Sequence, residues 1–246
     1  MVGSFPAKTW RSGMSQMNHV SEQLERAWSW RESRGVFSET QAVRVFHGPG
    51  EGNGDLQDLA VDRFGDHFWI TEWEKASRGS SLETKKALAD FLSKKGAASA
   101  VALWRPAQGI PAKPETLFGN PPQDKFSVRE GDARFWIRLA DVKHPGLFLD
   151  HFPLRAWLRK KASGWRVLNT FAYTGSLSIA SGLAGAEHVT TLDLSKPTIS
   201  WAQENWALNG LSLDRARFIF GDVFEWLPRL KREKKEFDCI ILDPPS

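Results

Sequence analysis

The C-terminal part of the chain alternates short apolar runs with segments in which hydrophobic residues recur every three or four positions. This pattern is typical of strands followed by amphipathic helices. We expect strands at 166–169, 188–193, 216–220 and 238–242, and helices at 176–184, 195–208 and 223–231. Pro153 opens one further helix ahead of them. Alternating units of this size predict a parallel sheet with right-handed crossovers, and hence an α/β fold.

Before residue 143 the pattern is mixed and predicts a smaller α+β domain. The expected elements are helices at 15–34 and 82–95, strands at 42–47, 58–63, 67–73 and 98–104, and a hairpin of 126–129 with 134–140. The second helix follows a capping box, Ser80-x-x-Glu83. The glycine-rich stretch 48–54 lacks the residues of a phosphate-binding loop and predicts a plain mobile loop, and the proline-rich stretch 105–124 predicts an extended one.

These patterns divide the chain into three parts. Residues 1–40 form an N-terminal helical segment, residues 41–142 form the small α+β domain, and residues 143–246 form the α/β domain. The middle part is a candidate RNA-binding or intermediate domain. The whole chain is mildly basic, with a net charge of +4 and a pI of about 9.2. That charge fits an RNA-binding enzyme but does not require one.

Composition narrows the class of protein. The chain has 246 residues, of which 41% are hydrophobic and 25% charged, and it contains neither an apolar run long enough to span a bilayer nor a signal-peptide core near its start. We therefore expect a cytoplasmic protein without membrane contact. Cys239 is the only cysteine, which excludes an intramolecular disulfide and argues against a cysteine-built metal site. No metal site is expected.

Two features suggest contacts with nucleic acid, and each has a structural alternative. Twelve tryptophans are available either for core packing or for base stacking. The basic residues of the helix after Pro153 are available either for phosphate contacts or simply as a solvated helix face; they are Arg155, Arg159, Lys160 and Lys161.

Polar and small residues follow all four strands of the α/β domain. In an open sheet of this kind, ligands bind at the carboxyl ends of the strands. Gly175 in the loop after the first strand allows a ligand to approach the backbone, and Asp193 after the second can accept hydrogen bonds from two ribose hydroxyls. Asp222 after the third strand can meet an adenine edge, and Asp243-Pro244-Pro245 follows the fourth.

Two cofactors fit this arrangement in outline. NAD usually requires G-x-G-x-x-G at the first turn, whereas the chain has one glycine in Tyr173-Thr174-Gly175-Ser176. S-adenosylmethionine has no pyrophosphate, so one glycine suffices, and the sequence favours it. Each signal alone is weak, since a strand-end aspartate is often a helix cap, but four in order are hard to explain by chance.

At these residues the chain resembles the bacterial large-subunit (23S) ribosomal RNA methyltransferases. It is most similar to the C-terminal, N7-guanine half of the bifunctional K/L-type enzyme, and also similar to the cytosine-5 branch. The resemblance covers roughly 18–246. Its segments are Ala60–Phe64, Gly146–His151, Phe171-Ala172-Tyr173-Thr174-Gly175-Ser176, Trp201–Asn205, Leu208–Leu211 and Asp243-Pro244-Pro245.

The resemblance implies a Rossmann-like class I methyltransferase fold with S-adenosyl-L-methionine as cofactor and ribosomal RNA as partner. It implies catalytic roles beside the target base for Asp243, Pro244 and Pro245. It implies cofactor contacts by residues of the strand-end loops and of the 146–151 segment: Phe148, Asp150, Asn169, Phe171, Tyr173, Thr174, Gly175, Asp193, Leu194, Asp222, Val223 and Asp243.

The chain departs from this family at two points. Phe152 occupies a position that is commonly arginine, although Arg155 matches the next basic position. The chain also ends at the loop after the fourth strand, so we expect a parallel sheet that is truncated at its C-terminus, with an unpaired edge and uncovered apolar side chains between Ile240 and Leu242.

The sequence predicts methyl transfer to a base of ribosomal RNA, with N7 of guanine favoured over C5 of cytosine. N7 already carries a lone pair, whereas C5 needs a cysteine nucleophile, and Cys239 lies inside a strand where a thiol is usually inert. In the cytosine-5 branch the resemblance implies a cysteine beyond the last residue of this chain, so the lack of a suitable cysteine here does not exclude that branch. Two other functions stay open, namely an inactive RNA-binding remnant and a methyltransferase for a protein or small-molecule acceptor. The oligomeric state is not predicted.

Overall fold

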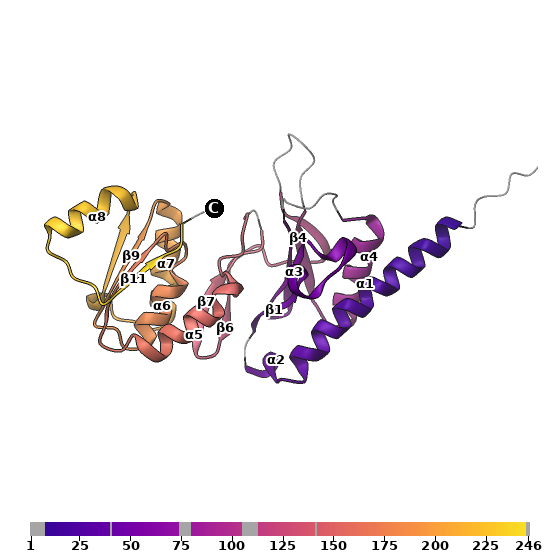
Figure 1. Ribbon diagram of the computed structural model, residues 1–246, viewed down its shortest axis with the longest axis horizontal. Coiled ribbons are helices and arrows are strands. Elements are labelled where there is room, and N and C mark those ends of the chain that lie inside the picture. The colour runs from indigo at the N-terminus through magenta and orange to yellow at the C-terminus, as the bar shows by residue number, and fades with distance from the viewer. Residues whose placement is uncertain (1–7, 40, 74–79, 105–112, 141, 245–246) are drawn as a thin grey trace, which may run out of the picture. The chain divides into compact units, whose positions relative to one another are not determined.

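The computed structural model describes residues 8–39, 41–73, 80–104, 113–140 and 142–244, and the chain divides into two compact units (Figure 1). The first unit consists of Met1–Lys125 and Arg138–Pro145, and the second of Phe126–Ile137 and Gly146–Ser246. Within the described residues, no helix combines the length and the apolar character needed to cross a membrane.

The first unit is a five-stranded sheet in the order β1-β2-β3-β4-β5 with helices packed against it. Its pairs are antiparallel except β3 with β4, which are parallel and joined through a helix. The elements are α1 (Lys8–Glu32), α2 (Val36–Glu39), β1 (Ala42–His47), α3 (Gly48–Glu51), β2 (Leu59–Phe64), β3 (His67–Glu72), α4 (Leu82–Lys94), β4 (Ser99–Leu103) and β5 (Glu115–Gly119).

Burial explains why these segments fold as they do. The apolar stripe of α1, including Leu24 and Trp28, packs with Leu88 of α4 and Val45 of β1 into one core. Trp28 is 7% exposed and lies at the centre of an aromatic group with Phe37, Phe68 and Phe91. Trp28 therefore serves core packing, which was one of the two roles considered for the tryptophans, and not base stacking.

Three expectations for this unit were wrong in detail. The glycine-rich stretch 48–54 is not a plain loop, because Gly48–Glu51 forms a short helix. An ion pair of 2.9 Å between Oε1 of Glu51 and Nη1 of Arg31 connects this helix to α1. The stretch 105–124 contains β5, which continues the sheet; residues 105–112 lie outside the described part of the chain. The cap of α4 is Ser81, whose side chain accepts from the amide of Thr84, while Ser80 donates to Glu72.

The second unit contains a four-stranded parallel sheet in the order β10-β9-β8-β11. Its elements follow the sequence expectation closely: α5 (Phe152–Lys161), β8 (Arg166–Thr170), α6 (Ser176–Leu183), β9 (His188–Asp193), α7 (Lys196–Leu208), β10 (Ala216–Phe220), α8 (Val223–Arg232) and β11 (Cys239–Leu242). The chain runs outward from β8 to β10 and then returns to the other side of β8. The connection therefore reverses direction between β8 and β11, where α/β sheets form ligand crevices.

Local signals set the helix starts in this unit. Ser195 caps α7 by accepting from the amide of Thr198, Asp222 caps α8, and a proline stands in the first turn of α5. β11 is the edge strand in the described part of the sheet. Ile241 is buried there, whereas Ile240 and Leu242 are 52% and 64% exposed, so only alternate residues of this strand are buried.

A hairpin of β6 (Phe126–Glu130) and β7 (Ala133–Ile137) belongs to the second unit, although the predicted boundary at 142/143 placed it with the small domain. Side chains of α7 hold it by its backbone. Asn205 accepts from the amide of Trp136 at 2.8 Å, and Asn209 bonds both the amide and the carbonyl of Arg134, at 2.8 and 2.7 Å. A domain boundary at residue 143 would separate these partners.

Candidate active site

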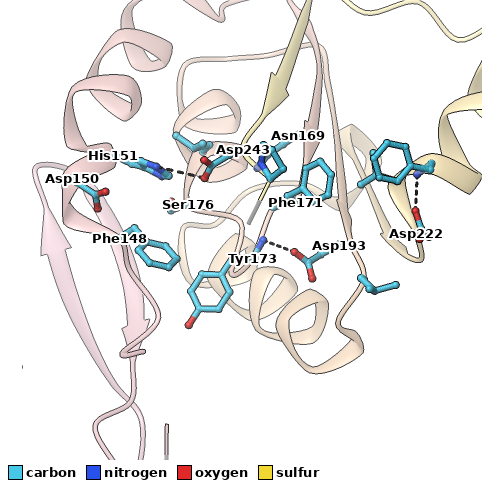
Figure 2. A pocket seen from close by; sticks show the side chains of 16 residues that line it. Phe148, Asp150, His151, Asn169, Phe171, Tyr173, Ser176, Asp193, Asp222 and Asp243 are labelled. Atoms are coloured by element: carbon cyan, nitrogen blue, oxygen red, sulfur yellow. Dashed lines mark hydrogen bonds and ion pairs between the residues drawn. The ribbon is translucent and has the colours of Figure 1, made fainter. Parts of the chain in front are cut away.

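A cavity of about 670 Å³ lies at the carboxyl ends of the four parallel strands (Figure 2). All its lining residues belong to the second unit. They are Phe148, Asp150, His151, Asn169, Phe171, Ala172, Tyr173, Ser176, Leu177, Asp193, Leu194, Asp222, Val223, Phe224, Asp243 and Pro244. Every strand-end segment singled out in the sequence therefore contributes to one space.

The loop after β8 has an unusual backbone. Phe171 and Tyr173 have φ values of 53° and 49°, which side chains with a Cβ rarely adopt, and Gly175 has 76°. The amide of Ala172 donates to the carbonyl of Leu192 at 3.1 Å and anchors the loop to β9. Strained residues of this kind persist where the surrounding structure holds them, and here they place two aromatic rings at the cavity.

Asp193 organises the floor of the cavity. Its carboxylate accepts from the amide of Tyr173 at 2.8 Å, from the amide of Ser195 at 2.8 Å and from the Thr198 hydroxyl at 3.0 Å. Its own carbonyl accepts from the amide of Gly221 at 3.0 Å. The carboxylate is thereby fixed in orientation. Its Oδ1 already accepts two hydrogen bonds, from Ser195 and Thr198, so it is Oδ2 that keeps further acceptor capacity for a ligand.

Tyr173 and Phe148 form one wall, with their ring centroids 5.2 Å apart. Burial, and secondarily the charge of Asp193, raises the pKa of the Tyr173 phenol, so this group stays protonated throughout the physiological range. The Tyr173 hydroxyl points away from Asp193, and it is the backbone amide that faces the carboxylate (Figure 2). Tyr173 therefore serves the cavity through its ring and its amide.

The opposite side comes from the loops after β9 and β10. Asp222 caps α8 by accepting from the amide of Phe224 at 2.7 Å, which occupies one carboxylate oxygen and leaves the other for a ligand. Leu194 and Phe224 are 67% and 76% exposed although both are large and apolar. Exposed apolar side chains that line a cavity are suited to packing against a flat ring.

Asp243 lines the cavity beside His151, which directly precedes α5. Its Oδ2 is 3.5 Å from Nε2 of His151, and the two groups form an ion pair when the imidazole is protonated (Figure 2). Pro244 also lines the cavity. Pro245, predicted as a third catalytic residue, lies outside the described residues.

Asn169 presents a buried polar atom at the same site. The residue is 1% exposed, and its amide nitrogen donates to Ser178 at 2.9 Å. Among the described residues, its Oδ1 finds no hydrogen-bond partner. A buried acceptor of this kind is costly unless a ligand or water completes it, which fits a ligand-binding role.

Two residues predicted from the sequence to contact a cofactor do not line the cavity. Thr174 is 1% exposed and its hydroxyl donates to the carbonyl of Gly146 at 2.5 Å. Gly175 packs against α7, where an added Cβ would stand 2.9 Å from that of Ala202. Both support the loop from behind, because their side of the turn faces α7 and the 146–151 segment.

The structure also corrects the phosphate-binding interpretation of two basic residues. Arg155 is 2% exposed and paired with Glu130, and Arg159 is paired with Asp132. Lys160 and Lys161 are exposed, as a phosphate contact requires.

Five lining residues were not predicted as site residues: His151, Ala172, Ser176, Leu177 and Phe224. His151 and Ala172 lie within the motifs that carried the resemblance, so their position in the motifs could have indicated them. Nothing in the pattern distinguishes Phe224 from the other apolar residues of α8.

Cys239 lies at the start of β11 and does not line the cavity. Burial raises the pKa of its thiol, so the thiolate is scarce at neutral pH. The structure thus agrees with the prediction that this thiol is inert.

The charges of the cavity select a kind of ligand. Asp150, Asp193, Asp222 and Asp243 line it, and no lysine or arginine is among the described lining residues. Such a site disfavours the pyrophosphate of a dinucleotide and suits a cationic ligand. S-adenosylmethionine carries a sulfonium and an ammonium group, and its nucleoside matches the acceptors and exposed apolar side chains described above.

This sheet order and this cavity define a Rossmann-like class I methyltransferase. The family model of S-adenosylmethionine-dependent methyltransferases matches residues 43–246. The chain belongs to that family, whose cofactor is S-adenosylmethionine.

A curated relative and two solved structures agree with this. Ribosomal RNA large subunit methyltransferase K/L of Chromohalobacter salexigens is 35% identical over 196 residues, which are 76% of this chain and 26% of the relative, so the chain spans about a quarter of that protein's length. SMU.776, a methyltransferase solved in complex with S-adenosylhomocysteine, is 24% identical with a TM-score of 0.80, over 94% of this chain and 58% of that one. The S-adenosylmethionine-dependent methyltransferase of Agrobacterium tumefaciens is 25% identical with a TM-score of 0.60, over 76% and 57%.

Proposed function

We propose that this chain transfers a methyl group from S-adenosylmethionine to a base of large-subunit ribosomal RNA. The observation that carries the proposal is the acidic cavity at the switch point of the sheet, with Asp243 and Pro244 among its lining residues. The similarity to the K/L enzyme supports ribosomal RNA as the substrate.

The residues of the cavity would act by binding and orientation. S-adenosylmethionine supplies an electrophilic methyl group when it is bound. The Asp193 carboxylate would accept hydrogen bonds from the ribose hydroxyls, with Asp222 beside the adenine ring and Leu194 and Phe224 enclosing it. Asp243 would accept from the edge of the target base and fix its angle of approach.

Within this proposal, N7 of guanine is favoured over C5 of cytosine. Attack by N7 requires no protein nucleophile, and the chain is similar to the K/L-type enzyme. Cys239, with its raised pKa and its place away from the cavity, is not a candidate for the nucleophile that C5 would need. A base held in a helix would have to be extruded to reach Asp243, so single-stranded or loop RNA is the favoured substrate. An RNA substrate of this kind would also place the protein in the cytoplasm.

The remaining assignments concern RNA contacts. Residues 41–142 are proposed to help hold the RNA, together with the exposed Lys160 and Lys161 of α5. Contacts to phosphate by these lysines would make the RNA affinity fall steeply as salt is raised.

The test measures donor binding and methyl transfer separately. Calorimetry with S-adenosylhomocysteine measures occupation of the cavity, and tritiated S-adenosylmethionine with 23S rRNA measures transfer, with the modified nucleoside identified by mass spectrometry. We expect binding, and 7-methylguanosine as the product. Asp243→Asn should lower transfer much more than it lowers S-adenosylhomocysteine affinity, and Asp214→Asn, an exposed acid away from the cavity, is the control.

Two other outcomes would contradict the proposed function. RNA binding without donor binding would contradict the enzyme and indicate an RNA-binding protein. Donor binding with transfer to proteins or small molecules, but not to RNA, would contradict the substrate.

A further inference from the structure

A buried ion pair joins α5 to the β6–β7 hairpin. Arg155 donates to both carboxylate oxygens of Glu130, from Nε at 2.6 Å and from Nη2 at 2.5 Å. The two side chains are only 2% and 6% exposed. The pair is therefore a bidentate contact that is almost fully removed from water.

Arg155 makes a third hydrogen bond, and this one reaches the wall of the cavity. Its Nη1 donates to the carbonyl oxygen of Phe148 at 2.7 Å. Phe148 lines the cavity, and Asp150 and His151 follow it within the same short turn. The guanidinium group thus connects the hairpin with the segment that carries three lining residues.

The same segment is held at its other end. The hydroxyl of Thr174 donates to the carbonyl oxygen of Gly146 at 2.5 Å, and an added Cβ on Gly146 would collide with Trp201 at 2.4 Å. Residues 146–151 are therefore fixed at two carbonyls, one by the loop after β8 and one by Arg155.

A buried ion pair by itself is weak evidence for stability. Removing two charges from water costs several kcal/mol, and replacing such a pair by apolar residues is often neutral or stabilising. Packing α5 on the hairpin thus does not require charges at these positions. Holding the Phe148 carbonyl does require a donor, and a planar guanidinium can serve Glu130 and Phe148 together.

We propose that Arg155 is a positioning residue for the donor site, which holds residues 148–151 against the cavity while Glu130 fixes its guanidinium group. The proposal rests on the assignment of the cavity as the S-adenosylmethionine site. It gives the hairpin a function in cofactor binding, although no residue of the hairpin lines the cavity among those described.

The chain provides a matched control. Arg159 and Asp132 also join α5 to the hairpin, but their side chains are 26% and 68% exposed, and in the described part of the chain neither makes a hydrogen bond or ion pair with the 146–151 segment. Loss of this outer pair removes a link between the same two elements without removing the Phe148 contact.

The experiment compares two double variants of the full chain, Arg155→Met/Glu130→Leu and Arg159→Met/Asp132→Leu. Calorimetry gives the dissociation constant for S-adenosylhomocysteine, and thermal unfolding gives stability. We expect the first variant to stay folded and to bind about tenfold or more weakly, as the loss of one charge-assisted hydrogen bond implies. We expect faster amide hydrogen exchange in residues 146–152 of that variant. The second variant should bind like the wild type.

Wild-type affinity in a folded Arg155→Met/Glu130→Leu variant would overturn the proposal. If that variant does not fold, Arg155→Lys replaces it. An ammonium group neutralises Glu130, but its single nitrogen lacks the planar set of three nitrogens that serves Glu130 and Phe148 together, so the same loss of affinity is expected. Failure of both to fold, with the control folded, would also overturn it, since the pair would then be a stability element. A wild-type protein that does not bind S-adenosylhomocysteine would contradict the proposed function instead.

Discussion

The backbone amide of Tyr173 donates to the carboxylate of Asp193 at 2.8 Å. This hydrogen bond links the strained loop after β8 to the end of β9, and the two residues stand twenty positions apart in the sequence. The same carboxylate therefore supports the backbone of one cavity wall and is proposed to bind the ribose of the cofactor.

Asp193→Asn should lower cofactor affinity more than it lowers stability. An amide keeps the size of the side chain but loses the charge and part of the acceptor capacity, and each charge-assisted hydrogen bond is worth about 1.5–3 kcal/mol. We expect affinity for S-adenosylhomocysteine to fall at least ~10-fold by calorimetry, with a smaller loss of stability in denaturant. Asp214→Asn should change neither quantity. Unchanged affinity in Asp193→Asn would remove this carboxylate from the proposed site.

Gly175→Ala should destabilise the second unit more than Gly164→Ala. Both glycines have nearly the same positive φ, 76° and 75°, so each substitution costs about 1–2 kcal/mol in backbone strain. Only at Gly175 does the new Cβ meet an atom, Ala202 Cβ at 2.9 Å, whereas nothing lies within 4 Å at Gly164. Overpacking adds about 1–3 kcal/mol at Gly175. Urea unfolding of the two variants measures the difference, and equal losses would show that α7 yields to the added methyl group.

Stability should fall as the pH is lowered below 6.5, partly because of His188. Burial, and then the charges of Lys235, Arg217 and Arg166 against the opposing effect of Glu187, lowers the pKa of this imidazole from 6.5. The unfolded chain then binds more protons than the folded one between the lowered pKa and 6.5, so acid favours unfolding in that window. His188→Gln should show a flatter pH dependence than the wild type between pH 7 and 5. An NMR titration that gives His188 a pKa of 6.5 or higher would contradict this sign.

Cys239→Ser should leave methyl transfer and cofactor affinity unchanged. The thiol lies outside the cavity, and its raised pKa keeps it protonated near neutral pH. For the same reason, Cys239 should react more slowly with a thiol reagent at pH 8 in the folded protein than in urea. Loss of transfer in the serine variant would revive the cysteine-dependent cytosine-5 mechanism.

The sequence predicted the parallel sheet well because its signals are local. Apolar runs such as Ile240–Leu242, caps such as Ser195 and the proline at the start of α5 act within a few residues, and the structure places these elements within one or two residues of the expected positions. Because ligands bind at the carboxyl ends of parallel strands, Asp193, Asp222 and Asp243 were expected at one edge of the sheet, and they do line one cavity.

The direction of individual side chains could not be predicted in this way. Motif position suggested a cofactor contact for Thr174, and the basic residues of its helix suggested a phosphate contact for Arg155. Both side chains are buried, with partners 28 and 25 residues away in the sequence. The hairpin was assigned to the wrong side of a boundary for the same reason, because its partners Asn205 and Asn209 follow it by more than sixty residues. Contacts over such separations leave no periodic signal in the chain.

The path of the chain through its two units also sets an order of events during synthesis. The hairpin leaves the ribosome well before α7, since 69 residues separate Trp136 from Asn205. At about 5–20 residues per second, this interval lasts ~3–14 s. An isolated two-stranded hairpin is marginally stable in water, so β6 and β7 lack their stabilising partner during this interval. The first unit, in contrast, has all its segments once Pro145 has emerged. Nascent-chain folding should therefore proceed in two stages, in which the hairpin of the second unit, although synthesised before the parallel sheet, is held in place only after α7 has emerged.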